Sequence, residues 1–260
     1  MRWWRKTEYT RTVVYVLVVS LVIWEIAVRL LDVKTFILPA PSQVIVELAR
    51  AWPFFLEQSF YTVYVTMMGF ILAVVGGVLL AIAIVASRFL ERTLYPLLVA
   101  LNSVPKVALA PLFVIWLGTG GAPKIAIAAL IAVFPIVINT TLGLRAVDPE
   151  MVNLARSARA SRRHIMMKIR FPNALPSLFA GAKVGISFAL IGAIVGEFVA
   201  GDRGLGYVIL ESQSTFNTPR AFGAILLLGV LGTIMFFVVE LCERLLLPWH
   251  VSQRGNADAL

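Results

Sequence analysis

The sequence predicts an all-α integral membrane protein with six transmembrane helices. The chain has 260 residues, of which 60% are hydrophobic and only 14% are charged. Soluble domains carry about 25% charged residues, so this chain has too few polar side chains to cover a water-soluble core. Six apolar runs each approach the ~20 residues that cross a bilayer as a helix. Connecting segments rich in basic residues alternate along the chain with segments poor in them, as in multi-pass membrane proteins.

The six expected spans lie at residues 12–31, 62–86, 95–117, 125–144, 176–200 and 221–247. The first is longer than the 7–15-residue apolar core of a signal peptide, and VRLLDVKTF offers no A-x-A-like cleavage site, so we expect this span to be retained. The third is interrupted by Pro105, Lys106 and Pro111. We expect residues 1–260 to form a single transmembrane domain.

The distribution of lysine and arginine predicts the orientation of the spans. Residues 1–11 carry four basic residues against Glu8, and residues 145–175 carry seven against Asp148 and Glu150. Residues 32–61 carry two basic and three acidic residues, and residues 201–220 carry two of each. Because basic segments remain on the cytoplasmic side, we expect both termini and residues 145–175 to be cytoplasmic.

The basic segment also has the pattern of a helix. Asp148-Pro149-Glu150 is typical of a helix start, with an Asp cap and Pro at the first helical position. One face then carries Leu154, Ala158, Ser161, Ile165 and Ile169, and another carries Arg156, Arg159, Arg163 and Arg170. We expect Pro172 to end this helix and Pro176 to begin the next span. The pattern fits either a helix lying on anionic lipid or a docking helix for a soluble partner.

A family resemblance favours the docking helix. The order A-R-x-x-x-A-S at residues 155–161, followed by PNALP at 172–176 and Gly181, resembles the EAA loop of permease subunits in binding-protein-dependent ABC importers. The wider chain resembles the sulfonate, taurine and nitrate branch of that family. The segments that carry this likeness are ILPAPSQV (37–44), SVPKVALAPLFVIWLGTG (103–120), FPIVINTTLGLRAVDPE (134–150) and GEFVAGDRGLGYVI (196–209).

The resemblance implies a type I ABC importer permease fold in the cell (inner) membrane. It implies a homodimer that works with two cytoplasmic ABC ATPase subunits and an extracytoplasmic solute-binding protein. It further implies a coupling helix that docks on the ATPase, formed by Asn153, Leu154, Ala155, Arg156, Ala158, Arg159, Ala160, Ser161 and Ile165. Asn153 and Arg159 replace the glutamate and the glycine of the family motif. Since glycine costs a helix about 1 kcal/mol, Arg159 predicts an unbroken, straighter coupling helix.

No ATP site is expected in this chain. A P-loop needs G-x-x-x-x-G-K-[ST], which GTGGAPK at residues 118–124 lacks, so this stretch is better interpreted as a turn. His164, His250 and the single Cys242 do not suggest a metal site, and we expect no cofactor. The basic residues lie between apolar spans without interleaved aromatics, which argues against nucleic acid. The chain is therefore expected to be a transport subunit rather than an enzyme, with ATP hydrolysed by a partner.

Polar residues inside the spans mark a candidate solute pathway, consisting of Asn102, Ser103, Lys106, Asn139, Thr140 and Glu197. A lysine facing lipid costs roughly 2.5–3.5 kcal/mol, so Lys106 should face the bundle interior or a wet cavity. Lys106 and Glu197 differ in depth by about 15 Å, which disfavours a direct pair. The alternative is that these residues hold the helices to one another.

We therefore expect import of a small solute, with Lys106 favouring an anion such as a sulfonate, taurine or nitrate. A vitamin precursor or another small nitrogen compound is the alternative. A different class, an ion-coupled secondary transporter, would use Glu197 and Lys106 as a relay, but the chain has no internal repeat to support it.

Overall fold

The computed structural model is entirely helical over residues 2–248, which are the residues the structure describes; for 2–10, 13 and 14 it describes the backbone alone. The helices are α1 (Arg2–Leu30), α2 (Pro41–Arg50), α3 (Trp52–Ala86), α4 (Arg88–Asn102), the 3₁₀-helix η1 (Lys106–Leu109), α5 (Ala110–Leu117), α6 (Gly121–Arg145), α7 (Pro149–Ser157), α8 (Arg162–Ile165), the π-helix η2 (Met166–Arg170), α9 (Phe171–Val199), α10 (Leu205–Ser214) and α11 (Thr218–Leu246).

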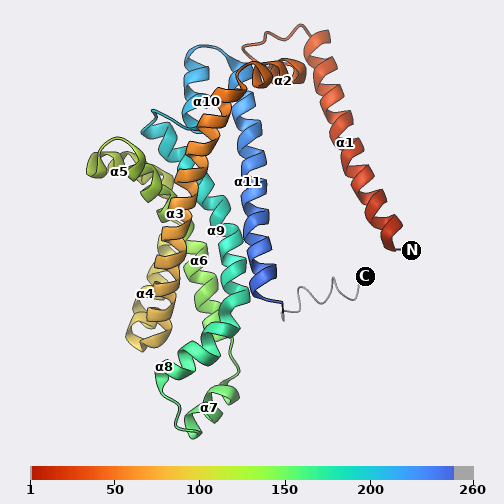
Figure 1. Cartoon of the computed structure of the whole chain (residues 1–260). Helices are drawn as coiled ribbons and strands as arrows, with labels where there is room; N and C mark the ends of the chain where they lie inside the picture. Colours follow the sequence, from red (N-terminus) through yellow and green to blue (C-terminus); the bar gives the residue numbers. More distant parts are fainter. Residues whose placement is uncertain (1, 249–260) are drawn as a thin grey trace.

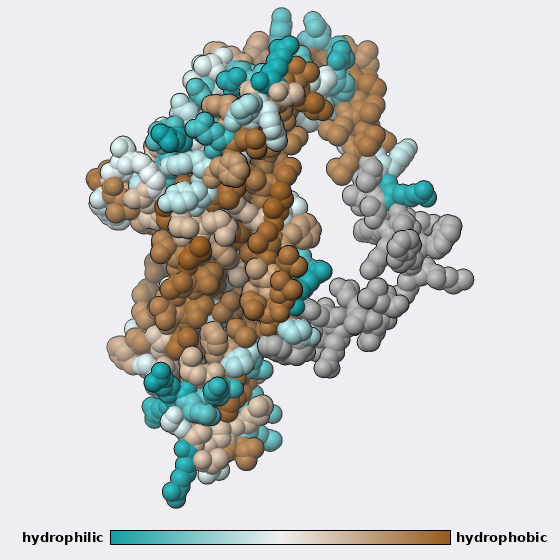
Figure 2. All heavy atoms as spheres, in the orientation of Figure 1, coloured by the Kyte–Doolittle hydropathy of each residue, from teal (hydrophilic) through white to brown (hydrophobic). Residues whose placement is uncertain are grey.

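The outer surface has the character expected of a membrane protein. Four helical stretches are long and apolar enough to cross a bilayer, namely α3, α6, the continuous run Arg162–Val199, and α11. The bent pair of α4 and α5 makes a fifth if it is one span. In Figure 2, hydrophobic side chains cover the middle of the visible face, and hydrophilic ones gather at its two ends. The first predicted span lies on α1, which stands apart from the bundle in Figure 1.

The core is built where α6 packs between α3 and α9. Gly69 of α3 and Gly192 of α9 both lie directly against Ala128 of α6, and further along Gly77 and Gly185 both lie against Ile136. Small residues let membrane helices approach closely when lipid supplies no hydrophobic driving force between them. One end of this bundle carries α10, and the other carries α7 and α8 (Figure 1).

The third predicted span is not a continuous helix. α4 ends at Asn102, and the segment Lys106–Leu117 that follows is turned by 91° from it. Pro105 supplies no N–H to continue the α4 hydrogen-bond ladder, and its ring disfavours helical geometry at Val104. A short 3₁₀ turn, η1, then leads into α5.

The prediction that Pro172 ends one helix and Pro176 begins another is wrong. α8, η2 and α9 form one helical run from Arg162 to Val199 that contains both prolines. The π turn of η2 precedes Pro172, and in it the Phe171 N–H bonds to the Met166 carbonyl, five residues back. Such a widened turn rearranges the backbone hydrogen bonds just before the proline, so that the chain continues as a helix.

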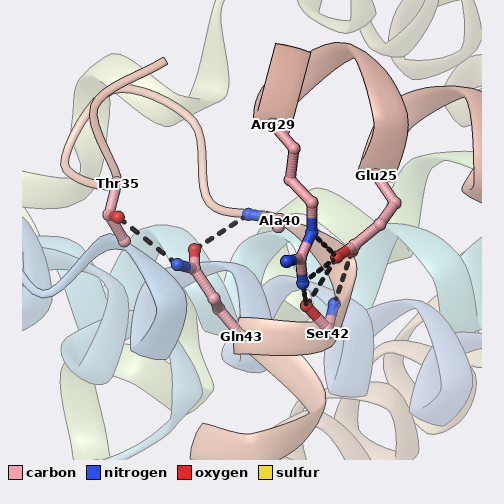
Figure 3. Close-up of polar contacts among 6 residues, drawn as sticks. All are labelled: Glu25, Arg29, Thr35, Ala40, Ser42 and Gln43. Atoms are coloured by element: carbon pink, nitrogen blue, oxygen red, sulfur yellow. Dashed lines mark hydrogen bonds and ion pairs between the residues drawn. The ribbon is translucent and has the colours of Figure 1, made fainter. Parts of the chain in front are cut away.

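A polar elbow joins α1 to α2 (Figure 3). The Glu25 carboxylate accepts hydrogen bonds from the Ser42 N–H at 3.0 Å and from the Ser42 hydroxyl at 2.8 Å. Arg29 Nε donates to the same carboxylate at 2.6 Å. Ser42 lies in the first turn of α2, so Glu25 places negative charge where the helix dipole favours it. This accounts for a charged residue inside the first predicted span.

Candidate functional site

A small apolar cluster holds together the loop between α6 and α9. As predicted, Asp148 caps α7: its side chain accepts the Glu150 N–H at 2.8 Å, and Pro149 is the first helical residue. Val147, Val152 and Ile165 are buried against one another, with Ala155, Ala160 and Ile169 packed around them. α7 and α8 are therefore held in a defined position with respect to each other.

The prediction of an unbroken helix over residues 153–165 is wrong. α7 ends at Ser157, and α8 begins at Arg162 with Ser161 as its cap. The Ala160 N–H bonds to the Ala155 carbonyl at 2.9 Å, and the Arg159 N–H bonds to the Arg156 carbonyl at 2.9 Å. These two bonds form a Schellman motif, which requires a left-handed residue at its centre. Arg159 is that residue, with φ of 58°, so it takes the conformation usual for glycine.

The break divides the predicted docking residues into two groups. Ile165 is buried within this chain, so it cannot belong to an exposed docking face. Ala155 and Ala160 are half-buried. The exposed group consists of Asn153, Leu154, Arg156, Ala158, Arg159 and Ser161. Leu154 is 74% exposed and Met151 on the same helix is 55% exposed, which leaves an apolar edge on α7 that no described residue covers.

The structure brings Lys106 and Asn102 together at the break after α4. Lys106 Nζ donates to the Asn102 carbonyl at 2.9 Å and to the Asn102 side-chain oxygen at 3.0 Å. The same ammonium lies 4.4 Å from the centre of the Phe134 ring on α6. Ser103 ends α4 and is exposed. The ammonium is thus held by oxygen atoms and a ring face, with no carboxylate partner among the described residues.

Asn139 and Thr140 lie elsewhere, inside the bundle. Asn139 Nδ2 donates to the Pro135 carbonyl one turn earlier at 2.8 Å, and its Cβ lies next to Gly181 of α9. Thr140 and its neighbour Thr141 are buried, and each hydroxyl lacks a hydrogen-bond partner among the described residues. These side chains pack between helices, apart from the pair formed by Lys106 and Asn102.

Glu197 is buried at the opposite end of the bundle, where it caps α10. The Thr62 hydroxyl donates to Glu197 Oε1 at 2.8 Å, and the Gly206 N–H donates to Oε2 at 2.8 Å. Thr62 also accepts the Leu205 N–H at 2.9 Å, and Gln58 accepts the Gly204 N–H at 2.7 Å. The first N–H groups at the start of α10, those of Gly204, Leu205 and Gly206, thereby have acceptors. As the difference in depth predicts, Glu197 does not pair with Lys106.

An ion pair that the sequence did not reveal lies beside this cap. Lys124 at the start of α6 is fully buried, and its ammonium donates to the Asp202 carboxylate and, at 3.2 Å, to the Tyr61 hydroxyl. The hydrogen bond from Lys124 lowers the pKa of Asp202 below its ordinary value. Lys124 and Asp202 are 78 positions apart, and in the sequence each stands in a separate short loop.

Comparisons with known proteins place these features in a family context. The model of the family "binding-protein-dependent transport system inner membrane component" matches residues 73–248. The chain is 34% identical to the formylaminopyrimidine transport permease protein ThiX of Halalkalibacterium halodurans, with 90% of this chain and 93% of the relative aligned. It is 36% identical to the riboflavin transport system permease protein RibX of Chloroflexus aurantiacus, with 91% and 89% aligned.

A third relative and a solved structure complete the comparison. The chain is 31% identical to the putative aliphatic sulfonates transport permease protein SsuC of Bacillus subtilis, over 91% of this chain and 87% of the relative. It superimposes on a chain of the inward-facing MetNI methionine ABC transporter with a TM-score of 0.59 and 22% identity. That match covers 76% of this chain and 94% of the other. The MetNI likeness establishes the fold alone.

Proposed function

The chain belongs to the family of binding-protein-dependent transport system inner membrane components, and we propose that it is the membrane-spanning subunit through which a small solute enters in an ATP-driven importer. Its relatives are permease proteins of ABC systems, and it is a multi-pass membrane protein like them. The energy for transport comes from a separate ATPase subunit, since this sequence carries no P-loop.

We propose that the ATPase docks on the exposed apolar edge of α7. Leu154 and Met151 are exposed in this chain, although water disfavours two neighbouring large apolar side chains on a short polar helix. Ala158 beside them is small and exposed, which allows a partner to approach closely. The cluster around Val152 and Ile165 joins α7 to α8, and α8 continues through η2 into α9, so a push on α7 would reach the bundle along this helical run.

We further assign six spans, with both chain ends and α7–α8 on the cytoplasmic side. Helix ends that share a cluster support this assignment. Ala81 near the end of α3, Leu144 at the end of α6 and Ala174 at the start of α9 pack together. α3 and α6 therefore run in the same direction and α9 runs in the opposite one, as the second, fourth and fifth of six spans should. The basic residues of the α7–α8 end agree with a cytoplasmic position. A second copy of this chain and an extracytoplasmic binding protein complete the assembly, as the family resemblance implies.

For the substrate, we place a small nitrogen heterocycle ahead of an anion. The relatives named for formylaminopyrimidine and riboflavin are more similar to this chain, at 34% and 36% identity, than the relative named for sulfonates, at 31%. The anion expectation depended on Lys106, and the structure already surrounds that ammonium with two oxygen atoms and the Phe134 ring.

The rival class of ion-coupled transporter is disfavoured by the position of Glu197. Its carboxylate accepts hydrogen bonds from the Thr62 hydroxyl and from a backbone N–H of α10, as the side chain of a helix cap does. An ion relay would need this carboxylate to exchange protons or ions with water or with Lys106, and in the structure Glu197 does not pair with Lys106.

Reconstitution in liposomes tests this proposal. The chain purified alone should hydrolyse no ATP, and uptake should require an ATPase subunit and a binding protein. With those present, labelled formylaminopyrimidine and riboflavin should be taken up faster than taurine or nitrate, and Lys106→Ala should leave that uptake within about twofold. ATP-independent uptake driven by an ion gradient would overturn the proposed class. Uptake of the anions alone, lost in Lys106→Ala, would reverse the proposed substrate order.

A further inference from the structure

A large basic cavity lies at the α7–α8 end of the bundle, beside the proposed docking edge of Met151, Leu154 and Ala158, none of which lines it. Its volume is about 1100 Å³, and its walls come from the end of α3, the start of α4, the end of α6 and the segment from α7 to η2. Six arginines line it: Arg88, Arg145, Arg156, Arg162, Arg163 and Arg170. Glu91 is the one acidic residue in the lining, so five positive charges stand uncompensated.

The pairing of these arginines is incomplete. Arg145 forms an ion pair with Glu91 at 2.9 Å and lies over the Tyr95 ring, but its Nε is buried and meets no acceptor among the described residues. The guanidinium groups of the other five make no hydrogen bond or ion pair with the described part of the chain. The buried Nε of Arg145 lacks the partner that buried polar atoms nearly always have, and the like charges of the more exposed arginines repel one another across the cavity. Both facts favour an anion as the ligand.

The cavity is also partly apolar. Ile82, Val85 and Ala86, from the last turn of α3, line it together with Met166 and Met167 of η2. The apolar run of α3 ends at Ala86, and Ser87 begins the turn into α4. The cavity therefore lies where a membrane-crossing helix gives way to polar chain. A ligand suited to it has a strongly anionic head and an apolar portion beside it.

We propose that this cavity binds the phosphoryl group of an anionic phospholipid. Arginine forks bind phosphate oxygens in pairs, which satisfies several donors with one group. Basic pockets at the cytoplasmic ends of membrane helices are suited to such headgroups. A bound headgroup would tie the α3–α4 turn to α8 and η2, and so would set the position of α7. The proposal depends on the membrane orientation assigned above but not on ATPase docking.

Native mass spectrometry of the full-length permease in detergent tests the proposal. The protein is titrated with phosphatidylglycerol and, separately, with phosphatidylcholine of the same acyl chains. We expect phosphatidylglycerol to bind at least tenfold more tightly. Arg88→Gln/Arg170→Gln, which removes one arginine from each of two walls, should weaken phosphatidylglycerol binding roughly 30-fold. Arg92→Gln/Arg203→Gln removes the same charge outside the cavity and should weaken it less than threefold.

Thermal unfolding of both double variants checks that they are folded. If the cavity variant unfolds, the single change Arg163→Gln at an exposed position replaces it, with about a fivefold loss expected. Equal affinity for the two lipids, or equal losses in the cavity and control variants, would overturn the proposal. Displacement of phosphatidylglycerol by inorganic phosphate at equal concentration would identify a soluble anion instead. Co-purification of the cavity double variant with the ATPase gives one further result. If that variant binds phosphatidylglycerol as the parent does but no longer binds the ATPase, the occupant of the cavity is an acidic segment of the ATPase instead.

Discussion

Arg159 shows how a single residue shapes the candidate docking site. The family motif has glycine at this place, and the structure gives Arg159 the left-handed backbone that glycine adopts without cost. Helix propensity alone predicts the opposite, an unbroken helix through residues 153–165. The propensity argument fails here because burying Val152 and Ile165 in one cluster requires the chain to turn between α7 and α8. Tertiary packing outweighs a preference worth less than 1 kcal/mol.

Replacing Arg159 tests this backbone geometry. A non-glycine residue in the left-handed region costs roughly 1–2 kcal/mol, so Arg159→Gly should stabilise the turn, while Arg159→Ala should not. The readout is hydrogen exchange of the Ala160 N–H, which bonds to the Ala155 carbonyl. We expect exchange about fivefold slower or more in Arg159→Gly than in Arg159→Ala. Equal rates in the two variants would mean that Arg159 does not hold a left-handed conformation.

The pair of Lys124 and Asp202 makes a pH-dependent contribution to stability. Lys124 holds the pKa of Asp202 below its ordinary value of about 3.9. A carboxyl with a lowered pKa in the folded state stabilises the fold above its unfolded pKa and loses that effect as the pH falls through the folded pKa. The contribution should therefore be constant from pH 7 to 5, should decline below about pH 4, and should be lost only once the pH is below the folded pKa.

Asp202→Asn should remove this contribution and leave Lys124 buried without its anion. We expect a loss of about 1–2 kcal/mol at pH 7, less than for a fully buried pair, since the Asp202 side chain is 57% exposed. Thermal unfolding in detergent from pH 7 to 3 measures it, with Glu211→Gln on α10 as the control. A variant as stable as the parent at pH 7, with the same fall below pH 4, would show that the pair contributes nothing.

At the scale of elements, apolar runs and short-range caps were predictable, and breaks were not. Runs of about 20 apolar residues mark α3, α6, α9 and α11, because a bilayer leaves few other conformations open to them. Asp148 and Pro149 mark the start of α7 for purely local reasons. Pro172 and Pro176 misled the prediction, because a π turn can carry a helix into a proline. Pro105 marks the place where α4 ends, but the 91° angle of the turn that follows is not contained in a local sequence pattern.

The close approach of α6 to its two neighbours makes Ala128 a sensitive point of the bundle. A Cβ added at Gly192 would lie 2.6 Å from the Ala128 Cα, so Gly192→Leu should force α9 away from α6. Overpacking of this kind typically costs 1–3 kcal/mol, and a contact against backbone cannot relax easily. We expect a lower yield of folded protein and a lower unfolding temperature. Gly229→Leu on α11, where an added Cβ meets nothing within 4 Å, is the matched control.

At the scale of the whole molecule, the polar residues inside the spans separate into distinct groups. Lys106 and Asn102 meet at the break after α4, Asn139 and Thr140 pack within the bundle, and Glu197 caps α10. The sequence located all of them but did not reveal their partners, which lie up to 135 positions away. Figure 1 places the α10 cap and the α7–α8 loop at opposite ends of the bundle.

Co-purification of the Leu154→Glu variant with the ATPase tests whether the exposed edge of α7 receives that subunit. Leu154 is 74% exposed, so the change should leave folding and yield unaltered while placing a charge in the proposed contact. We expect ATPase binding to weaken by at least 30-fold, as at an interface hot spot. Asn153→Glu adds the same charge one residue away, where the family carries glutamate, and should retain the ATPase. Retention of the ATPase by Leu154→Glu at the yield of the parent chain would show that the ATPase does not dock on this edge of α7.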